Sequence, residues 1–212
     1  EMPIQYSSII KEQDAVRNTA GMFDISHMGK FTLQGKNLIS QLEYLVPSDL
    51  SRLQPGQAQY TVLLNHQGGI VDDIIIYYQG TDSFDTQKVV IIVNAATTDK
   101  DKTWILAHID PNTVEFQDLS RDKILIAVQG PTATNHLQSL VTNDLSAIKA
   151  FGHLETTIFG KYAFLARTGY TGEDGFEVMV DLPVGMDLWQ NLYNVGVIPC
   201  GLGCRDTLRL EA

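Results

Sequence analysis

The sequence predicts an α+β fold of two similar units, each a sheet with helices on one face. Two observations predict it: a repeat at a constant offset of 95 residues, and the same order of strand, helix, strand pair and closing helix in each copy. The 212 residues are 44% hydrophobic and 19% charged, enough for one large domain or two small ones with their own cores. Two related sheets leave a groove between them, and such grooves are favoured places for a ligand.

The repeat is clearest over residues 34 to 51. Eight positions in this span are identical to the residues 95 positions later, whereas average residue usage predicts about one such match. The matched residues are Gln34, Gly35, Leu42, Leu45, Val46, Asp49, Leu50 and Ser51 in the first copy, with Gln129, Gly130, Leu137, Leu140, Val141, Asp144, Leu145 and Ser146 in the second.

The first copy is preceded by a helix over 8–20, which we expect Gly21 to end. Apolar alternation, helical spacing and turn residues predict the elements that follow. They are a strand at 31–33, a leucine-rich helix, strands at 59–65 and 70–78 around the turn 66–69, a strand at 88–93, and an amphipathic helix with Trp104 after 97–99.

The second copy repeats this order. Its elements are a strand at 124–128, a helix with Pro131 in its first turn, strands at 162–168 and 176–181 around the Gly-rich segment 169–175, and a helix with Trp189 after Gly185. The strand at 88–93 has no counterpart in this scheme, so the first copy is predicted to have one strand more.

Composition excludes several classes of function. The net charge of −10, without a local basic cluster, predicts no nucleic-acid partner. No apolar run approaches the roughly 20 residues that span a bilayer, so we expect a soluble protein with no membrane partner. Cys200 and Cys204 are expected to be ordinary thiols of a reducing compartment, with neither a disulfide nor a metal site. The chain begins at Glu1 without an initiator methionine and stops within a helical pattern, so we expect a fragment of a longer protein.

The most unusual strand is 70–78, because Asp72 and Asp73 interrupt an apolar run. Carboxylates are rarely buried without a partner. Alternation sends the two side chains to opposite faces of the strand, so at most one of them points into a given cleft. A solvated strand end explains either Asp taken alone, and spacing does not choose between them.

The segment from Arg167 to Glu177 contains three glycines, which allow close backbone approach or positive φ. Such a loop is able to wrap a flat ligand, although a simple turn is the commoner reading. Phe176, Val178 and Val180 form the apolar face of the following strand. Glu177 is therefore expected on the opposite face, where a carboxylate accepts N–H groups.

Two other sets of polar residues have ordinary interpretations. Arg205 and Arg209 lie four residues apart near Asp206 and Glu211, and ion pairing on a solvated helix face is the default reading. The five histidines (His27, His66, His108, His136 and His153) form no metal-binding or Ser/His/Asp pattern, which argues against a hydrolase or a zinc enzyme.

Many motifs along the whole chain together resemble the glycine cleavage T-protein family. They are Glu1-Met2-Pro3, Ala15-Val16-Arg17, the segment from Gly21 to Gly29 that ends Ser26-His27-Met28-Gly29, Gly68-Gly69-Ile70-Val71-Asp72-Asp73, Val93-Asn94-Ala95-Ala96, Gln129-Gly130-Pro131, the Gly169 to Gly175 loop, and Gly201-Leu202-Gly203-Cys204-Arg205-Asp206. Many ordered motifs at coherent spacing are more specific than any one of them. Cys204 departs from the family's usual Ala, a small apolar change.

The resemblance implies a fold and a division of the chain. It implies two pseudo-duplicated ferredoxin-like subdomains that form a folate-binding groove, with 1–29 and 118–212 in the first and 30–117 in the second. It also implies a short N-terminal segment and a C-terminal β-barrel domain that this chain lacks.

The resemblance also implies a site. It places Asp73, rather than Asp72, beside the folate N10 as the catalytic residue, and it places Glu177 and Arg205 at the pterin. Met28, Tyr60, Asn94 and Tyr170 are implied to line the pocket.

The implied reaction transfers an aminomethyl group from lipoylated H-protein to tetrahydrofolate, with release of ammonia and formation of methylene-tetrahydrofolate. Tetrahydrofolate is a cosubstrate, and no metal is implied. The implied location is the cytoplasm in a bacterium or the mitochondrial matrix in a eukaryote.

Two alternatives remain open. The same fold occurs in the folate domains of sarcosine and dimethylglycine oxidases and in a sulfonium demethylase, which use other one-carbon donors. A non-enzymatic folate-binding protein of the iron–sulfur assembly kind is an alternative of another class, although its K-G-C/Y-x-G-Q-E motif is not found in this sequence.

The repeat and the implied site each make one structural prediction. The segments 31–33 and 124–128 should occupy equivalent places in two superposable units. Glu177 and Arg205 should meet the same face of one groove as Asp73; an outward position of either side chain would contradict the site.

Overall fold

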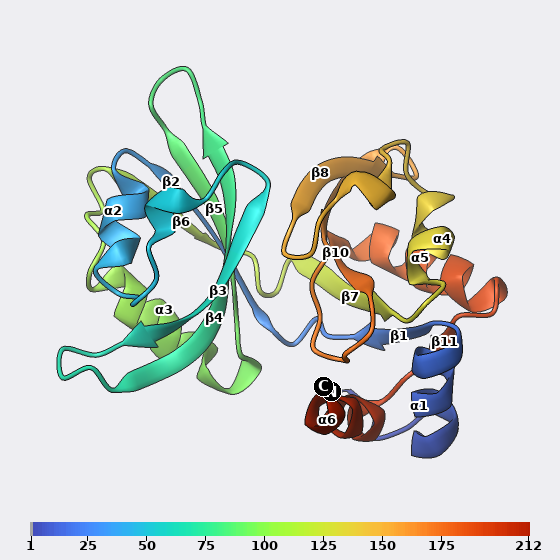
Figure 1. The fold of residues 1–212 in the computed structure, drawn as a ribbon. Helices are drawn as coiled ribbons and strands as arrows, with labels where there is room; N and C mark the ends of the chain where they lie inside the picture. The colour runs from blue at the N-terminus through green and yellow to red at the C-terminus, as the bar shows by residue number, and fades with distance from the viewer. Residues whose placement is uncertain (1) are drawn as a thin grey trace. The chain divides into compact units, whose positions relative to one another are not determined.

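The computed structural model describes residues 2–212. The chain divides into two compact units, of which unit 1 comprises the residues up to His27 together with Asp122–Ala212, and unit 2 comprises Met28–Arg121. Each unit is built on one sheet (Figure 1). The predicted α+β class with two sheets is therefore confirmed.

Unit 2 contains a sheet in the order β3-β4-β5-β2-β6, in which every neighbouring pair is antiparallel. Its elements are β2 (Gly29–Gly35), α2 (Leu38–Glu43), the 3-10 turn η1 (Leu50–Arg52), β3 (Gln57–Leu64), β4 (Ile70–Thr81), β5 (Gln87–Val93), η2 (Ala95–Thr97), α3 (Thr98–Leu106) and β6 (Val114–Asp118). Alternate strand residues such as Leu33, Ile74 and Ile91 pack with Leu42 of α2 and Ile105 of α3 in one apolar core. Both helices therefore cover the same face of the sheet.

Unit 1 contains a sheet in the order β11-β1-β7-β10-β9-β8. Its elements are α1 (Ile9–Asn18), β1 (Gly21–Asp24), β7 (Lys123–Gln129), α4 (Ala133–Gln138), η3 (Leu145–Ala147), β8 (His153–Ile158), β9 (Lys161–Ala166), β10 (Gly175–Asp181), α5 (Leu182–Asn194), β11 (Ile198–Pro199) and α6 (Leu202–Glu211). Val128 and Val178 pack with Leu137 of α4 and Leu188 of α5, while α1 and α6 lie together near β1 and β11.

The two sheets share one topology. From β3 the strands run β3, β4, β5, β2, β6, and from β8 they run β8, β9, β10, β7, β1. The helices α2 and α4 begin at Leu38 and Ala133, which are 133 − 38 = 95 residues apart. Because β2 and β7 hold the same place in their sheets, the prediction of a structural repeat is confirmed.

Four strands were missed, namely β1, β6, β8 and β11, and the comparison of strand numbers was wrong. The second copy also has its full strand set, because β8 precedes β9 and corresponds to β3. Phe159 and Gly160 join β8 to β9 with φ of 52° and 72°. Two positive φ values favour Asn-Gly or Asp-Gly in a two-residue hairpin. Because Phe is unusual in that position, the sequence pattern did not predict this turn.

The first helix is shorter than predicted. It ends at Asn18, and Gly21 is the first residue of β1 rather than the end of the helix. A Cβ on Gly21 would lie 2.4 Å from Val16 Cγ2 and 2.6 Å from Cys200 Sγ. Glycine is therefore required here by close packing between α1 and the strand, rather than by a helix cap.

Glu12 is a fully buried carboxylate in α1 that ties three segments of unit 1 together. Its Oε1 accepts the N–H groups of Tyr6 and Ser7 at 2.7 and 2.8 Å, and its Oε2 accepts the N–H of Gly201 at 2.8 Å. Gly201 is the N-cap of α6, where unpaired N–H groups and the helix dipole favour a negative charge. The carboxylate thus fixes the N-terminal segment and the start of α6 against α1.

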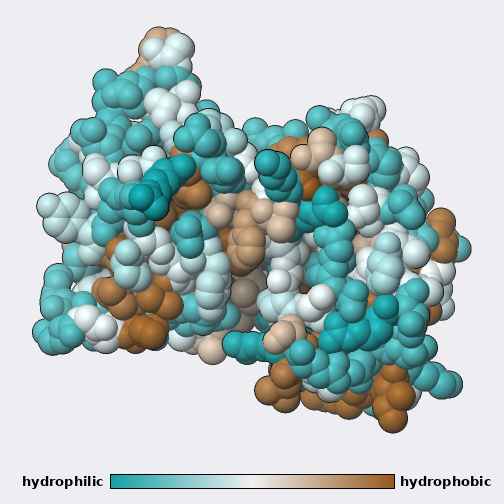
Figure 2. All heavy atoms as spheres, in the orientation of Figure 1, coloured by the Kyte–Doolittle hydropathy of each residue, from teal (hydrophilic) through white to brown (hydrophobic). Residues whose placement is uncertain are grey.

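The outer side of α1 and α6 exposes apolar side chains (Figure 2). Ile10 is 79% exposed and Leu210 is 88% exposed. Within residues 2–212, no helix has both the length and the apolar character needed to cross a membrane.

Glu12→Gln should destabilise the protein by about 1–3 kcal/mol, because the amide replaces one acceptor oxygen by a donor that faces backbone N–H groups. Urea unfolding of the variant and the parent measures this difference. Asp14→Asn is the matched control, since Asp14 lies on the exposed side of the same helix. Equal stability of the Glu12 and Asp14 variants would contradict the role assigned to Glu12.

Candidate functional site

The two carboxylates at the start of β4 point to opposite faces of the unit 2 sheet. Asp72 pairs with Leu63 across the ladder, on the side of the core, and its Oδ2 accepts the Thr97 hydroxyl at 2.5 Å. Asp73 pairs with Val62, and its Oδ2 accepts the hydroxyl of Tyr60 at 3.1 Å. Asp72 therefore faces α3, and Asp73 lies on the opposite face of the sheet. Sequence spacing alone did not decide which carboxylate lies on which face.

Asn94, directly after β5, connects the two carboxylates. Its Nδ2 lies 3.0 Å from Asp73 Oδ1, 3.2 Å from the Asp73 carbonyl, and 3.2 and 3.3 Å from the two Asp72 oxygens. All four neighbours are acceptors, so the amide nitrogen rather than the oxygen must face them. The amide holds Asp73 at the end of the sheet while the Tyr60 hydroxyl holds it from β3.

The hydroxyl–carboxylate pair on β3 and β4 has a counterpart in unit 1. Tyr162 of β9 donates to Glu155 Oε1 of β8 at 2.6 Å. In each hairpin the two residues are diagonal neighbours on one face. Burial and then the Glu155 hydrogen bond raise the pKa of Tyr162, which keeps its hydroxyl a donor. Donor and acceptor have exchanged strands between the copies, since the tyrosine is on β3 in one and on β9 in the other.

The Gly-rich segment of unit 1 is held by the side chain of Gln129. Its Nε2 donates to the Thr168 carbonyl at 3.0 Å, and its Oε1 accepts the Thr171 hydroxyl at 3.0 Å. A Cβ on Gly169 would lie 2.2 Å from Gln129 Oε1, so this approach requires glycine. Gly172 has φ +79°, a conformation that L side chains rarely adopt. Both uses of glycine match the expectation from the sequence.

Tyr170, Glu177 and Arg205 line one pocket of unit 1. Phe23, Ile25 and Ala127 provide apolar parts of its wall. Glu177 is 7% exposed, opposite the apolar face of β10 as predicted, and its Oε2 accepts the Thr168 hydroxyl at 2.6 Å. The pocket thus combines an apolar wall with a carboxylate and a guanidinium.

Arg205 does not follow the default reading of ion pairing on a solvated helix face. Its guanidinium carbon lies 4.5 Å from the centre of the Tyr170 ring, and its buried Nε has no hydrogen-bond partner among the described residues. Burial lowers its pKa. Glu211 pairs with Arg17 instead. Arg205 therefore presents a cation and an unused donor beside an aromatic ring.

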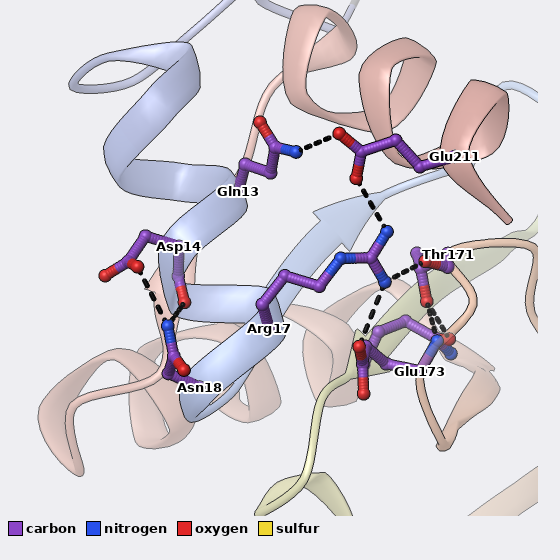
Figure 3. Close-up of polar contacts among 8 residues, drawn as sticks. Gln13, Asp14, Arg17, Asn18, Thr171, Glu173 and Glu211 are labelled. Atoms are coloured by element: carbon purple, nitrogen blue, oxygen red, sulfur yellow. Dashed lines mark hydrogen bonds and ion pairs between the residues drawn. The ribbon is translucent and has the colours of Figure 1, made fainter.

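Arg17 of α1 joins the Gly-rich loop to α6 (Figure 3). Its Nη1 donates to the Thr171 carbonyl at 2.6 Å and to Glu173 at 3.0 Å, while its Nη2 donates to Glu211 at 2.9 Å. Gln13, one turn earlier on α1, also donates to Glu211 at 2.6 Å. These contacts fix the two segments that carry Tyr170 and Arg205.

The residues implied by the resemblance fall into two local groups. Tyr60, Asp73 and Asn94 come together in unit 2. Tyr170, Glu177 and Arg205 come together in unit 1. Met28 is half-buried before β2, and its carbonyl accepts Lys30 Nζ at 2.7 Å. A common groove for Asp73, Glu177 and Arg205 involves both units and stays a prediction.

Sequence reasoning missed the residues that support these groups. Asp101 is fully buried in the first turn of α3, four residues before the buried Ile105. That spacing puts a carboxyl group in the apolar stripe of a helix, which is a signal the sequence did contain. Arg17 and Gln129 act through partners more than 35 residues away, so no local pattern points to them.

Two histidines that are distant in sequence also meet. His66 Nε2 and His108 Nε2 lie 3.3 Å apart beside Trp104, and His108 Nδ1 lies 2.7 Å from the Trp104 carbonyl. In the part of the chain that the structure describes, no group of three or more His, Cys, Asp or Glu side chains is arranged to hold a metal ion. The pair packs the β3–β4 turn against α3.

Comparison with known proteins places this geometry in context. Residues 1–212 match the family model described as the GCVT N-terminal domain. The chain is 71% identical to an aminomethyltransferase of Nostoc sp. and 64% identical to one of Rippkaea orientalis, covering 100% of this chain and 56% and 58% of those proteins. The chain thus spans little more than half the length of these curated relatives.

Solved structures give a similar result. The fold matches the crystal structure of glycine cleavage system aminomethyltransferase T from Bartonella henselae with a TM-score of 0.87 and 31% identity, over 100% of this chain and 56% of that one. A heterotetrameric sarcosine oxidase from Corynebacterium sp. matches with a TM-score of 0.60 and 12% identity, over 88% of this chain and 89% of that one. At that identity the second likeness shows the fold alone.

Arg17→Ala should loosen the Gly-rich loop and the last turn of α6. Loss of charged hydrogen bonds to partly exposed partners should cost about 1–2 kcal/mol locally, which raises amide exchange about 5- to 30-fold. Hydrogen–deuterium exchange at residues 170–174, relative to β10, measures this change. Arg52→Ala is the control, because the Arg52–Asp49 pair is 84% and 52% exposed and should contribute little. Unchanged amide exchange at residues 170–174 would contradict the conclusion that Arg17 fixes the Gly-rich loop to α6.

Proposed function

We propose that this chain, which belongs to the family of the GCVT N-terminal domain, forms the folate-binding part of an aminomethyltransferase of the glycine cleavage system. The name of the curated relatives supports the activity. The observation that carries the substrate class is the pocket of unit 1, where the buried carboxylate of Glu177 lies with Arg205 and Tyr170. The cyanobacterial sources of the relatives support a bacterial cytoplasmic location.

The donors and acceptors of that pocket fit a pterin. A pterin presents an amide N–H and an exocyclic amine on one edge, and a carboxylate is able to accept both. The flat ring is suited to the wall formed by Tyr170 and apolar side chains. The unused Nε donor of Arg205 is available to a carbonyl or ring nitrogen. These three properties support Glu177, Arg205 and Tyr170 as pterin-binding residues.

The donor substrate is proposed to be the aminomethylated lipoyl arm of H-protein. The aminomethyl carbon leaves the lipoyl sulfur, its nitrogen leaves as ammonia, and the products are the dihydrolipoyl thiol and methylene-tetrahydrofolate. Tetrahydrofolate supplies the two amine nitrogens, N5 and N10, between which the one-carbon unit becomes bonded.

Asp73 is proposed to hold and accept the proton of N10. Tyr60 and Asn94 each donate to one of its oxygens, which orients the carboxylate on the face opposite α3. General-base assistance by a positioned carboxylate contributes about 10²- to 10⁴-fold. Met28 is proposed to line the folate-binding pocket and to help exclude water from it. Exclusion of water protects the reactive one-carbon unit from hydrolysis.

The activity is tested with the full-length protein, aminomethylated H-protein and tetrahydrofolate. We expect methylene-tetrahydrofolate and ammonia in equal amounts. Tight folate binding without turnover would favour a non-enzymatic folate-binding protein. Turnover with sarcosine or dimethylglycine as the donor, but not with H-protein, would favour the same-fold demethylating enzymes.

Asp73→Asn should lower turnover by about 10²- to 10⁴-fold while the dissociation constant for tetrahydrofolate changes by no more than a few-fold, because Asn keeps the shape but accepts no proton. Asp72→Asn should lower turnover much less, since that side chain faces α3 and its amide oxygen still accepts. Turnover and folate binding are measured for both variants in one assay. A larger loss of turnover at Asp72 would refute the assignment of the catalytic carboxylate.

A further inference from the structure

Asp101 is a buried carboxyl group that the reaction does not use directly. Its side chain is 0% exposed in the first turn of α3. Among the described residues, no N–H or O–H group donates to either of its oxygens. A charged carboxylate in that setting would lack the hydrogen bonds that compensate for lost water.

The neighbour of Asp101 is another carboxyl group. Asp72 of β4 lies within hydrogen-bonding reach of Asp101, and its charge acts on the Asp101 carboxyl group. Two carboxylates that share a site repel each other, whereas one shared proton makes the contact a strong hydrogen bond. The Thr97 hydroxyl also lies nearby, but it has a single proton and donates it to Asp72 Oδ2 at 2.5 Å. The Asp72–Asp101 contact therefore requires a proton on one of the two carboxyl groups.

Asp72 is the better candidate for the charged member. It accepts from Thr97 and from Asn94 Nδ2, and both bonds favour a carboxylate. Asp101 has no such donors among the described residues. The proton consequently belongs on Asp101.

We propose that Asp101 is a neutral carboxylic acid that donates its proton to Asp72, and that this pair positions Asp73 through the side chain of Asn94. The protonation rests on the burial of Asp101, on its lack of donors among the described residues and on its contact with Asp72. The importance of Asp73 for catalysis rests on the proposed function.

The link to Asp73 runs through one amide. Asn94 Nδ2 has two hydrogens for four oxygen neighbours, and its shortest contact, 3.0 Å, is to Asp73 Oδ1. When Asp101 supplies a donor to Asp72, Asp72 competes less for the Asn94 amide. Without that donor, the amide is drawn toward Asp72 and releases Asp73. Asp101 is thus a positioning residue that acts on Asp73 through Asp72 and Asn94.

The pKa values agree with this assignment. Burial, and then the hydrogen bond and charge of Asp72, raise the pKa of Asp101 to about 7. Burial acts to raise the pKa of Asp72 as well, but hydrogen bonds from Thr97, Asp101 and Asn94 outweigh it and lower the value. The nearby cation is Lys100, whose Nζ donates to the Val71 carbonyl at 2.5 Å and whose charge favours ionised Asp101.

A raised pKa in the folded state makes this proton a pH-dependent contribution to stability. The folded protein keeps it up to about pH 7, whereas an unfolded Asp loses it near its ordinary value of 3.8. The contribution is therefore complete below the unfolded pKa and is lost as pH rises toward 7. Asp101→Asn removes the titrating group and should flatten this part of the stability profile.

The experiment compares Asp101→Asn, Asp101→Ala and the control Asp99→Asn in the full-length protein. Asp99 is exposed in the same helical turn. Because Asn is neutral and keeps a donor, the Asp101→Asn variant should retain most of the turnover of the unsubstituted protein. The Asp101→Ala variant should have a turnover about 10- to 100-fold lower, because Asp73 is misplaced. The dissociation constant for tetrahydrofolate should change by no more than a few-fold in both.

Two measurements need no activity. Carboxyl ¹³C NMR of the unsubstituted protein should show Asp101 titrating near pH 7, and the Asn94 side-chain amide resonance should shift in Asp101→Ala but stay near its original position in Asp101→Asn. An Asp101 pKa at or below its ordinary value would overturn the proton assignment. An unmoved Asn94 resonance in Asp101→Ala, or equal damage by Asn and Ala, would overturn the positioning role. Absence of turnover in the unsubstituted protein would refute the proposed function and leave both NMR outcomes decisive for the pair.

Discussion

The alternation of side chains along antiparallel strands is the constraint on which the rest of this structure depends. On β4 it turns Asp72 toward α3 and Asp73 to the other face, so that adjacent carboxyl groups enter different surroundings. On β10 it puts Phe176 in the core and leaves Glu177 opposite it. A shift of one residue in either register would exchange these environments, because the side-chain period is two. The core and the candidate site are therefore specified by the same pairing.

The parts of the fold that depend on local pattern or on repetition could be predicted from the sequence. The offset of 95 residues predicted equivalent strands, and the glycines at 169 and 172 predicted a loop with close approach and positive φ. The β8–β9 hairpin was missed because a Phe takes a left-handed turn position that a Gly or Asn usually marks. A turn is thus predicted from the sequence only where its residues are of the types that usually adopt its backbone conformation.

The surroundings of the candidate side chains required the structure. Helical spacing indicated an ion-paired Arg205, but packing against Tyr170 and burial of its Nε depend on a loop more than 30 residues earlier in the chain. Arg17 and Glu12 likewise act through distant segments. In unit 1 these contacts converge on α1, which contributes no residue to the pocket but fixes the loop and helix that do. Long-range polar contacts of this kind leave no periodic trace in a single sequence.

The exchanged tyrosine–carboxylate pairs bear on the history of the two halves. If both descend from one half-length gene, Tyr60–Asp73 and Glu155–Tyr162 are separated by two substitutions at corresponding positions. A path through two facing carboxylates meets charge repulsion, whereas a path through two tyrosines keeps an aromatic pair able to hydrogen-bond. Charge repulsion therefore favours a double-tyrosine hairpin over a double-carboxylate hairpin as the intermediate. The acid now proposed to act in unit 2 is then either the original residue or a later replacement of one of those tyrosines, and reconstructed ancestral sequences distinguish the two.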